Sequence, residues 1–248
     1  MKVFITGATT GIGLEVAKLY LSEGHQVALC GRDLGKLPSD FASIYPKAKL
    51  YQVDVLEKEK LASFITEFSQ GELDLVIANA GISMGVKSRL PDFDSWRRVI
   101  DTNIHGVINT FEPALKIMIP KKKGHLVAMS SVAGFNGLPG AGPYSASKAA
   151  VKTFSESLSI DLKREGIDVT TICPGFIDTP LTRKNPHPMP WLMDVTKGAK
   201  LIKKAIDKKK AIYLFPWQMK IVVLFLSYLP RSLYKFIMTV KLFNFSKE

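Results

Sequence analysis

The sequence predicts an α/β fold, a doubly wound parallel sheet of seven strands with helices on both faces. Short apolar runs rich in β-branched residues alternate along the chain with segments of helical periodicity. Such alternation is typical of parallel sheets that are covered on both faces. A glycine-rich turn also follows the first apolar run directly. It would therefore lie at the carboxyl ends of the strands, where open α/β sheets bind their ligands.

Each element follows from local patterning. Strands are expected at residues 2–6, 26–30, 49–53, 73–78, 125–129, 168–173 and 211–215. The first helix follows Gly13, buries Val16, Leu19 and Tyr20 on one face, and ends at Gly24. A weaker helix follows Asp33. Further helices are expected over residues 57–68, 93–118 and 144–164.

Length and composition limit the number of domains that the chain can form. The chain has 248 residues and no low-complexity linker, so we expect one domain over residues 1–215 with a helical extension over residues 216–248. Cys30 and Cys173 end separate strands, without the spacing of a disulfide or metal site. They are expected to be free buried thiols of a reducing compartment. The first strand begins by residue 3, which leaves no room for a signal peptide and favours the cytoplasm.

Charge is distributed unevenly. Residues 183–248 carry 14 Lys or Arg against 3 Asp or Glu, whereas residues 1–182 carry 20 against 19. This asymmetry favours an anionic partner, either a membrane surface or a nucleic acid. A solvated lysine-rich face is the simpler alternative. The chain shows no nucleic-acid recognition module, so no nucleic-acid partner is expected.

The glycine turn after the first strand fits a phosphate-binding loop. Gly7 permits a tight turn, and Gly11 and Gly13 allow a pyrophosphate to approach the backbone at a helix N-terminus. The spacing differs from Gly-x-Gly-x-x-Gly, and no Gly-Lys-Ser/Thr follows, which disfavours a P-loop. A purely structural turn is the alternative.

Tyr144 and Lys148 are the candidate catalytic pair. Their i, i+4 spacing places them on one helix face, with Cβ atoms about 5–6 Å apart. A nearby ammonium favours the phenolate, so the pKa of Tyr144 is expected to fall below about 10. Such a phenol can exchange a proton with a carbonyl or alcohol. Ser131, at the end of a strand, would bring a hydroxyl to the same place. Tyr-x-x-x-Lys at a helix start is also common without any function.

Several motifs in order resemble the short-chain dehydrogenase/reductase family, over about residues 2–215. Asn79-Ala80-Gly81 matches its fourth-strand motif, with Ala78 in place of the usual leading Asn. The other matches are Thr6-Gly7-x-x-x-Gly11-Ile12-Gly13 at the cofactor turn, Asn103, Ser131, Tyr144 and Lys148 at the catalytic tetrad, and Pro174-Gly175-x-x-x-Thr179 on the nicotinamide side.

The resemblance implies a Rossmann-type fold and a role for each tetrad residue. Tyr144 would be the general acid in reduction and the base in oxidation. Lys148 would hold the nicotinamide ribose and lower the pKa of Tyr144, and Ser131 would orient the substrate oxygen. Asn103 would hold a water that links Lys148 to solvent, or would be an ordinary polar helix residue. The implied cofactor contacts are Gly7, Thr9, Thr10, Gly11, Ile12, Gly13, Arg32, Asp54, Val55, Asn79, Ala80, Gly81, Tyr144, Lys148, Pro174, Gly175, Ile177 and Thr179. No metal is expected.

Arg32, at the end of the second strand, favours NADP(H) over NAD(H). An arginine there can pair with a 2′-phosphate, whereas an acidic residue would repel it. Asp33 follows directly and weakens this preference, and a solvent-exposed arginine is the alternative. Asp54 matches the family position that contacts the adenine amino group, and it could also be a helix N-cap.

The substrate is expected to be a lipophilic carbonyl or alcohol. In the family, the stretch over about residues 181–194 covers the substrate, and here it combines three prolines with the apolar residues Met189, Trp191, Leu192 and Met193. A lid that packs on its own protein is equally compatible. His187 has no ligand-like partner and is interpreted as structural or exposed.

The C-terminal quarter contains an apolar stretch near a bilayer-spanning length, the 19 residues 211–229. Pro216 and Lys220 interrupt it, and its first five residues are needed as a strand. A second apolar and basic helix follows Pro230 and would include Leu233, Phe236, Ile237, Val240 and Phe243, with Arg231, Lys235 and Lys241. An interfacial anchor on anionic lipid, on the inner face of a membrane, is one hypothesis. Cover for the cleft, a subunit interface and a true span are the others.

Together these observations predict an NADP(H)-dependent oxidoreductase that interconverts a carbonyl and an alcohol. A cofactor-binding redox sensor or a membrane-associated scaffold without turnover is the alternative. By analogy with the family, we expect a homodimer or homotetramer formed through the helices that carry Asn103 and Tyr144.

Overall fold

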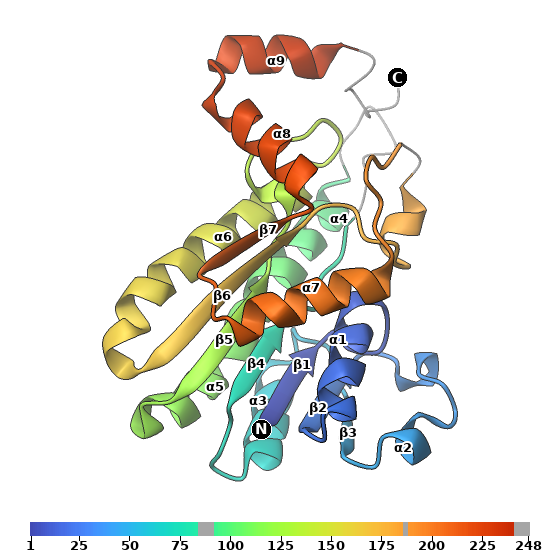
Figure 1. The fold of residues 1–248 in the computed structure, drawn as a ribbon, viewed down its shortest axis with the longest axis vertical. Helices are drawn as coiled ribbons and strands as arrows, with labels where there is room; N and C mark the ends of the chain where they lie inside the picture. The colour runs from blue at the N-terminus through green and yellow to red at the C-terminus, as the bar shows by residue number, and fades with distance from the viewer. Residues whose placement is uncertain (84–91, 186–187, 241–248) are drawn as a thin grey trace.

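Seven parallel strands form the centre of the computed structural model, which describes residues 1–83, 92–185 and 188–240 (Figure 1). All neighbouring strands pair in parallel, in the order β3-β2-β1-β4-β5-β6-β7. The chain builds β1 to β3 outward on one side and then returns to place β4 beside β1. Open α/β sheets bind their ligands at such a reversal, which here lies at the carboxyl ends of β1 and β4. The strands are β1 Lys2–Thr6, β2 Gln26–Gly31, β3 Ala48–Gln52, β4 Leu75–Ala78, β5 Gly124–Met129, β6 Ile167–Pro174 and β7 Ile212–Phe215.

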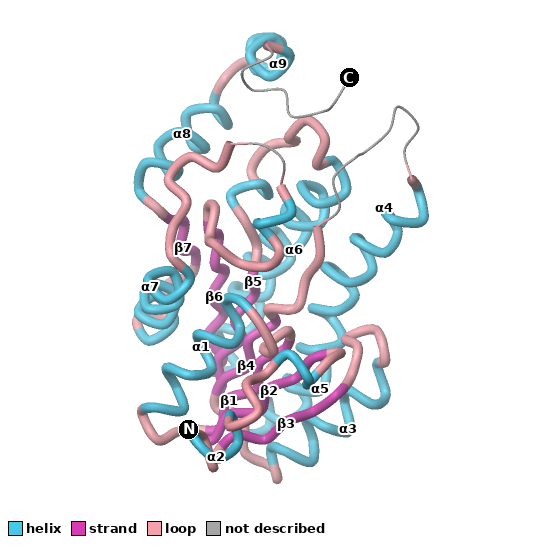
Figure 2. The backbone as a smooth tube through the Cα atoms, turned by 90° about the vertical axis from the view of Figure 1, so that its right-hand side faces the viewer, coloured by secondary structure: helices cyan, strands magenta, loops and turns pink. Residues whose placement is uncertain are grey.

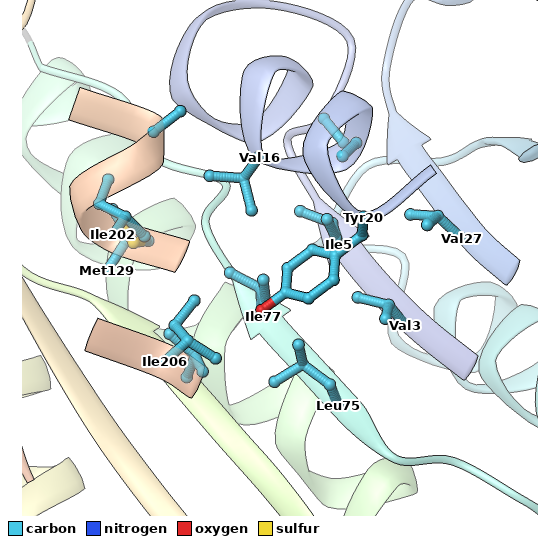
Figure 3. Close-up of a cluster of buried hydrophobic side chains, with 14 of the residues drawn as sticks. Val3, Ile5, Val16, Tyr20, Val27, Leu75, Ile77, Met129, Ile202 and Ile206 are labelled. Atoms are coloured by element: carbon cyan, nitrogen blue, oxygen red, sulfur yellow. The ribbon is translucent and has the colours of Figure 1, made fainter. Parts of the chain in front are cut away.

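Two helix layers cover the sheet because successive strand residues point to opposite faces. Val3 and Ile5 of β1 pack toward α1 and α7, whereas Phe4 packs toward α3 and α5. Figure 2 shows these layers on either side of the strands. In Figure 3 the ring of Tyr20 from α1 lies among side chains of β1 and β4. The helices are α1 Gly11–Ser22, α2 Phe41–Ile44, α3 Lys58–Ser69, α4 Phe93–Ile100, α5 Gly106–Lys121, α6 Gly142–Asp161, α7 Val195–Asp207, α8 Trp217–Tyr228 and α9 Arg231–Thr239.

The predicted fold class is confirmed, and most strand bounds agree within two residues. The helix expected over residues 93–118 is instead divided by a π-helical turn, η2 (Asp101–His105), between α4 and α5. The weak helix expected after Asp33 is a short 3-10 turn, η1 (Leu34–Lys36), followed by α2. The helix that contains Tyr144 ends at Asp161 rather than near residue 164. A 3-10 turn follows, and Gly166 closes it in the left-handed region at φ 69°.

The C-terminal helices α8 and α9 extend beyond the carboxyl end of β7 (Figure 1). Met219 and Val223 of α8 and Tyr234 of α9 are buried, so the two helices pack partly on the rest of the chain. Among the described residues, no helix is long and apolar enough to cross a bilayer. Phe243 and Lys241 of the predicted second helix lie outside the described residues. Cys30 and Cys173 are both buried free thiols, as predicted.

Candidate active site

The glycine turn ends in a helix whose N-terminus has no side-chain cap. Gly7 and Gly11 adopt φ values of 64° and 58°, in the left-handed region that favours glycine. Thr10 precedes α1 and makes no side-chain capping bond, and the first turn of α1 contains no acidic residue. The partial positive charge at the start of this helix is therefore not compensated by a carboxylate. Such a helix start favours an anionic group.

Asn79 and Gly13 hold this turn against the sheet. The Asn79 side-chain amide donates to the carbonyl oxygens of Thr6 at 3.0 Å and Gly7 at 2.9 Å. A Cβ atom on Gly13 would lie 2.5 Å from both the Gly7 carbonyl oxygen and Asn79 Nδ2. Gly13 is thus required for packing within the turn. A Cβ on Gly7 would similarly lie 2.7 Å from Ala80 Cα.

Arg32 and Asp33 follow β2, and their charged groups differ in the hydrogen-bond and ion-pair partners that they have within the protein. The Arg32 guanidinium is 58% exposed and lies 3.8 Å from the Asp54 carboxylate. The Asp33 carboxylate accepts a hydrogen bond from the Gly35 N–H at 3.0 Å and faces Lys36 Nζ at 3.7 Å. Asp33 therefore caps η1, and its charge is already partly satisfied.

The remaining adenine-side positions are held by close packing. Asp54 accepts from the Leu56 N–H, and Glu57, not Asp54, precedes α3, so the alternative that Asp54 caps this helix is wrong. Val55 is buried, and its carbonyl oxygen accepts from Asn109. A Cβ on the glycine at position 31 would lie 2.6 Å from Thr9 Cγ2. Thr9 thus covers the end of β2.

Asn103, Ser131, Tyr144 and Lys148 come from three separate elements. Ser131 follows β5, Tyr144 and Lys148 lie on α6, and Asn103 lies in η2. Lys148 Nζ lies 5.7 Å from the centroid of the Tyr144 ring and donates to the Met129 carbonyl oxygen at 2.8 Å. A Cβ on Gly81 would lie 3.1 Å from Asn103 Oδ1 and 3.4 Å from Lys148 Nζ. Both side chains therefore reach the same point, at the end of the segment that follows β4.

The Asn103 amide is engaged with the protein. Its Oδ1 accepts from the Ile82 N–H at 2.8 Å, and its Nδ2 donates to the Ile82 carbonyl oxygen at 3.0 Å and to Ser147 Oγ at 2.9 Å. Both amide hydrogens are thus used. Ser147 was missed by sequence reasoning, although its place three residues after Tyr144 puts it on the same side of α6 as that residue. π-Helical turns are frequent at functional sites, and η2 is the turn that contains Asn103.

Burial controls the protonation of the pair. Burial raises the pKa of Tyr144, and a hydrogen-bonding contact with Ser131 opposes that rise. Burial also lowers the pKa of Lys148 to about 8. The expected fall in the pKa of Tyr144 is wrong in this structure, because the cost of desolvating a phenolate outweighs the opposing contact with Ser131.

The segment after β6 closes over the glycine turn. The Gly175 N–H, after Pro174, donates to the Phe215 carbonyl oxygen at 2.7 Å. Thr179 packs on the start of α1, since a Cβ on Gly11 would lie 3.3 Å from its Cγ2. Ile177 is buried against α7, which makes its side chain part of the core.

The expected substrate loop is partly packed and partly exposed. Met193 bridges back to Ile177, whereas Trp191 and Leu192 are 45% and 44% exposed. The Arg183 guanidinium binds both Asp178 carboxylate oxygens, at 2.7 and 3.2 Å, which fixes the turn η5 (Thr182–Lys184). His187 lies outside the described residues.

The loop between Ser131 and Tyr144 is tied to the C-terminal helices. Asn136 is buried, donates to Ser227 Oγ at 2.9 Å, and accepts from the Arg231 guanidinium at 3.2 Å. The Tyr234 hydroxyl donates to the Gly137 carbonyl oxygen at 2.6 Å. Sequence reasoning missed Asn136, because its partners lie more than 90 positions away.

Comparison with known proteins identifies a family, sequence relatives and solved structures that this chain resembles. A model of the short chain dehydrogenase family matches residues 1–190. An uncharacterized oxidoreductase of Myxococcus xanthus is 36% identical over 235 residues, which cover 93% of each chain. One of Mycobacterium tuberculosis is 34% identical over 226 residues, covering 87% of this chain and 88% of the relative. The structure of ElxO with NADP bound has a TM-score of 0.76 and 28% identity, and the match covers 86% of this chain and 96% of ElxO.

Proposed function

The chain belongs to the short-chain dehydrogenase/reductase family and is an oxidoreductase that acts on CH–OH groups, and on this premise we propose that it interconverts a lipophilic carbonyl compound and its alcohol with NADP(H). The observation that carries this proposal is the meeting of Asn103, Lys148 and Tyr144 beside an uncapped helix start. A protein that only bound the cofactor would not need this set of groups. The alternative without turnover is therefore less well supported.

The residues present fit a nicotinamide adenine dinucleotide that carries a 2′-phosphate. The start of α1 would hold the pyrophosphate, Arg32 the 2′-phosphate and Asp54 the adenine, while Lys148 would hold the nicotinamide ribose. The other contacts proposed are Thr9, Thr10, Ile12, Val55, Asn79, Ala80, Gly81, Pro174, Gly175, Ile177 and Thr179. When bound, the nicotinamide supplies or accepts the hydride.

Tyr144 is the proposed general acid and base. Its raised pKa keeps the phenol protonated at neutral pH, which suits donation of a proton to a carbonyl oxygen in reduction. The Ser131 hydroxyl would orient that oxygen, since its contact with Tyr144 places it beside the same group. Asn103 would act as a positioning residue that joins η2 to the segment after β4, with Ser147 as its partner on α6.

The replacement of Tyr144 by Phe tests this mechanism. Tyr144→Phe should lower turnover of lipophilic ketones or aldehydes with NADPH by about 10²–10⁴-fold, because the proton donor is lost. NADPH affinity should stay within a few-fold, because the glycine turn is unchanged. Turnover would be followed by NADPH absorbance and affinity by nicotinamide fluorescence. Retention of full activity would contradict the role of Tyr144.

Cofactor preference is tested by titration with NADPH and NADH. The engagement of Asp33 by Gly35 and Lys36 supports a preference for NADPH, since it offsets the repulsion of a 2′-phosphate. Arg32→Ala should weaken NADPH binding about tenfold or more and leave NADH binding nearly unchanged. Asp33→Asn is the matched control, which should not weaken NADPH binding. Equal affinity of the native chain for both cofactors would contradict the preference.

We also propose that residues 1–215 form the oxidoreductase domain, that residues 216–248 extend it, and that the protein is a homodimer or homotetramer. An apolar groove on α5 and α6 supports self-association, and its lining includes Ile108, Ile119 and Phe154. All three side chains are more than a third exposed. Exposed apolar surface of this kind is typical of interaction sites.

A further inference from the structure

Helix α8 is apolar on two opposite faces. Met219 and Val223 are buried against the protein, whereas Trp217, Ile221, Phe225 and Tyr228 are all exposed. The spacing of these four residues, by four, four and three positions, places them in one stripe along the helix. Trp217 is 67% and Phe225 63% exposed. Packing among the residues that the structure describes therefore accounts for one face of α8 and leaves the other exposed.

Helix α9 continues this uncovered surface. Tyr234 is its buried residue, while Leu233 and Phe236 are exposed, and Val240 is exposed just after the helix ends. In Figure 1 α8 and α9 stand beyond the sheet, at the end of the molecule where the parallel strands finish. The α8–α9 face is defined here as Trp217, Ile221, Phe225, Tyr228, Leu233, Phe236 and Val240.

The charge around the α8–α9 face has one sign. Residues 216–240, which include both helices, contain three Lys or Arg and no Asp or Glu. Lys220, Arg231 and Lys235 come from the two helices themselves. A second copy of this face would bring like charges together, which disfavours self-association here. An apolar and aromatic surface with cations and no anions complements an anionic lipid surface.

The same end of the molecule bears the exposed part of the substrate loop. Trp191 and Leu192 are both exposed, and their loop lies at the same end of the molecule as α8, beyond the carboxyl ends of the strands (Figure 1). Contact of the α8–α9 face with lipid would therefore bring this loop, and the site behind it, close to the membrane.

We propose that the α8–α9 face binds an anionic membrane surface, lying in the headgroup region with its apolar side chains toward the acyl chains. The enzyme would then take up its lipophilic substrate from the membrane. Only this last point rests on the proposed function, because the membrane contact needs no reaction.

Flotation of the full chain with lipid vesicles tests the proposal. The chain should float with vesicles of phosphatidylcholine and phosphatidylserine, bind far less to phosphatidylcholine alone, and dissociate as salt is raised. The double variant Trp217→Ser/Phe225→Ser should lose binding. The double variant Lys220→Glu/Lys235→Glu should weaken it at least about tenfold. Ile44→Ser is the matched control, because Ile44 is 58% exposed on α2, at the opposite end of the molecule (Figure 1).

Thermal melting of each variant shows that the chain is folded, so loss of flotation reports the surface alone. The absence of flotation by the folded native chain would overturn the proposal. Equal, salt-insensitive binding to neutral vesicles would also overturn it, as would a fall in oligomer mass in Trp217→Ser/Phe225→Ser. NADPH titration of the same samples separates the two hypotheses. Flotation without cofactor binding would refute the proposed reaction and leave the membrane contact standing.

Discussion

Desolvation shifts the pKa of several deeply buried side chains of this protein toward their neutral forms. Lys148 lies close to the Tyr144 ring, yet burial raises the pKa of the phenol and lowers that of the amine. His125 of β5 behaves in the same way: it is 8% exposed, and burial lowers its pKa to about 4. Its Nε2 lies 2.8 Å from Thr170 Oγ1, which satisfies the neutral ring.

His125 should make the protein less stable as the pH falls from about 6.5 toward 4. In this window the unfolded chain binds a proton at His125 and the folded chain does not, so protonation favours unfolding. The free energy of unfolding should fall by about 1–2 kcal/mol between about pH 7 and pH 5 through this group.

Denaturant unfolding of His125→Gln at both pH values measures this contribution. Gln can still bond Thr170 but does not titrate, so the variant should lose about that much less stability than the native chain on acidification. An identical pH dependence in the two proteins would show that His125 contributes nothing.

At the level of elements, the loop between Ser131 and Tyr144 depends on helices far along the chain. It contains glycine and proline and little regular structure, but Asn136 and Gly137 are bound by α8 and α9. These contacts connect a proposed catalytic loop to the surface that we expect to meet lipid.

Tyr234→Phe should loosen this loop. Removal of one neutral hydrogen bond costs about 1 kcal/mol, so amide hydrogens of residues 132–143 should exchange about fivefold faster with solvent. Mass spectrometry of that peptide measures the effect. Tyr228→Phe is the matched control, because Tyr228 is 87% exposed and should leave exchange unchanged. Equal exchange in the two variants would mean that α9 does not hold the loop.

At the level of the whole molecule, we assign two of the exposed apolar surfaces to different partners. The α8–α9 face has cationic neighbours without acids, whereas the groove on α5 and α6 also contains the ion pair of Glu112 with Lys116. A surface with both charge signs can meet a second copy of itself without net repulsion.

Phe154→Ser should shift the protein toward monomer. We expect light scattering to give the mass of two or four chains for the native protein, because association buries the apolar groove. Ile160→Ser is the control, since Ile160 is 71% exposed on the same helix but outside the groove. A native chain that is monomeric, or one equally affected by both changes, would contradict this interface.

The sequence by itself determined the strands, the glycine turn and the identity of the candidate tetrad. Apolar periodicity and the left-handed φ of Gly7 and Gly11 are local properties, so they can be predicted before the fold is known. The order of elements then places Ser131 and Tyr144 at one edge of a parallel sheet, because all strands run the same way.

The tertiary structure alone decided the features that depend on distant partners. The π-helical turn at Asn103 faces Ile82, Asn136 binds residues of α8 and α9, and the two faces of α8 differ only in what covers them. The direction of the pKa shift of Tyr144 likewise depends on residues that are distant in the sequence. Desolvation is set by every atom packed around a group, whereas the spacing of two residues reports only their mutual attraction.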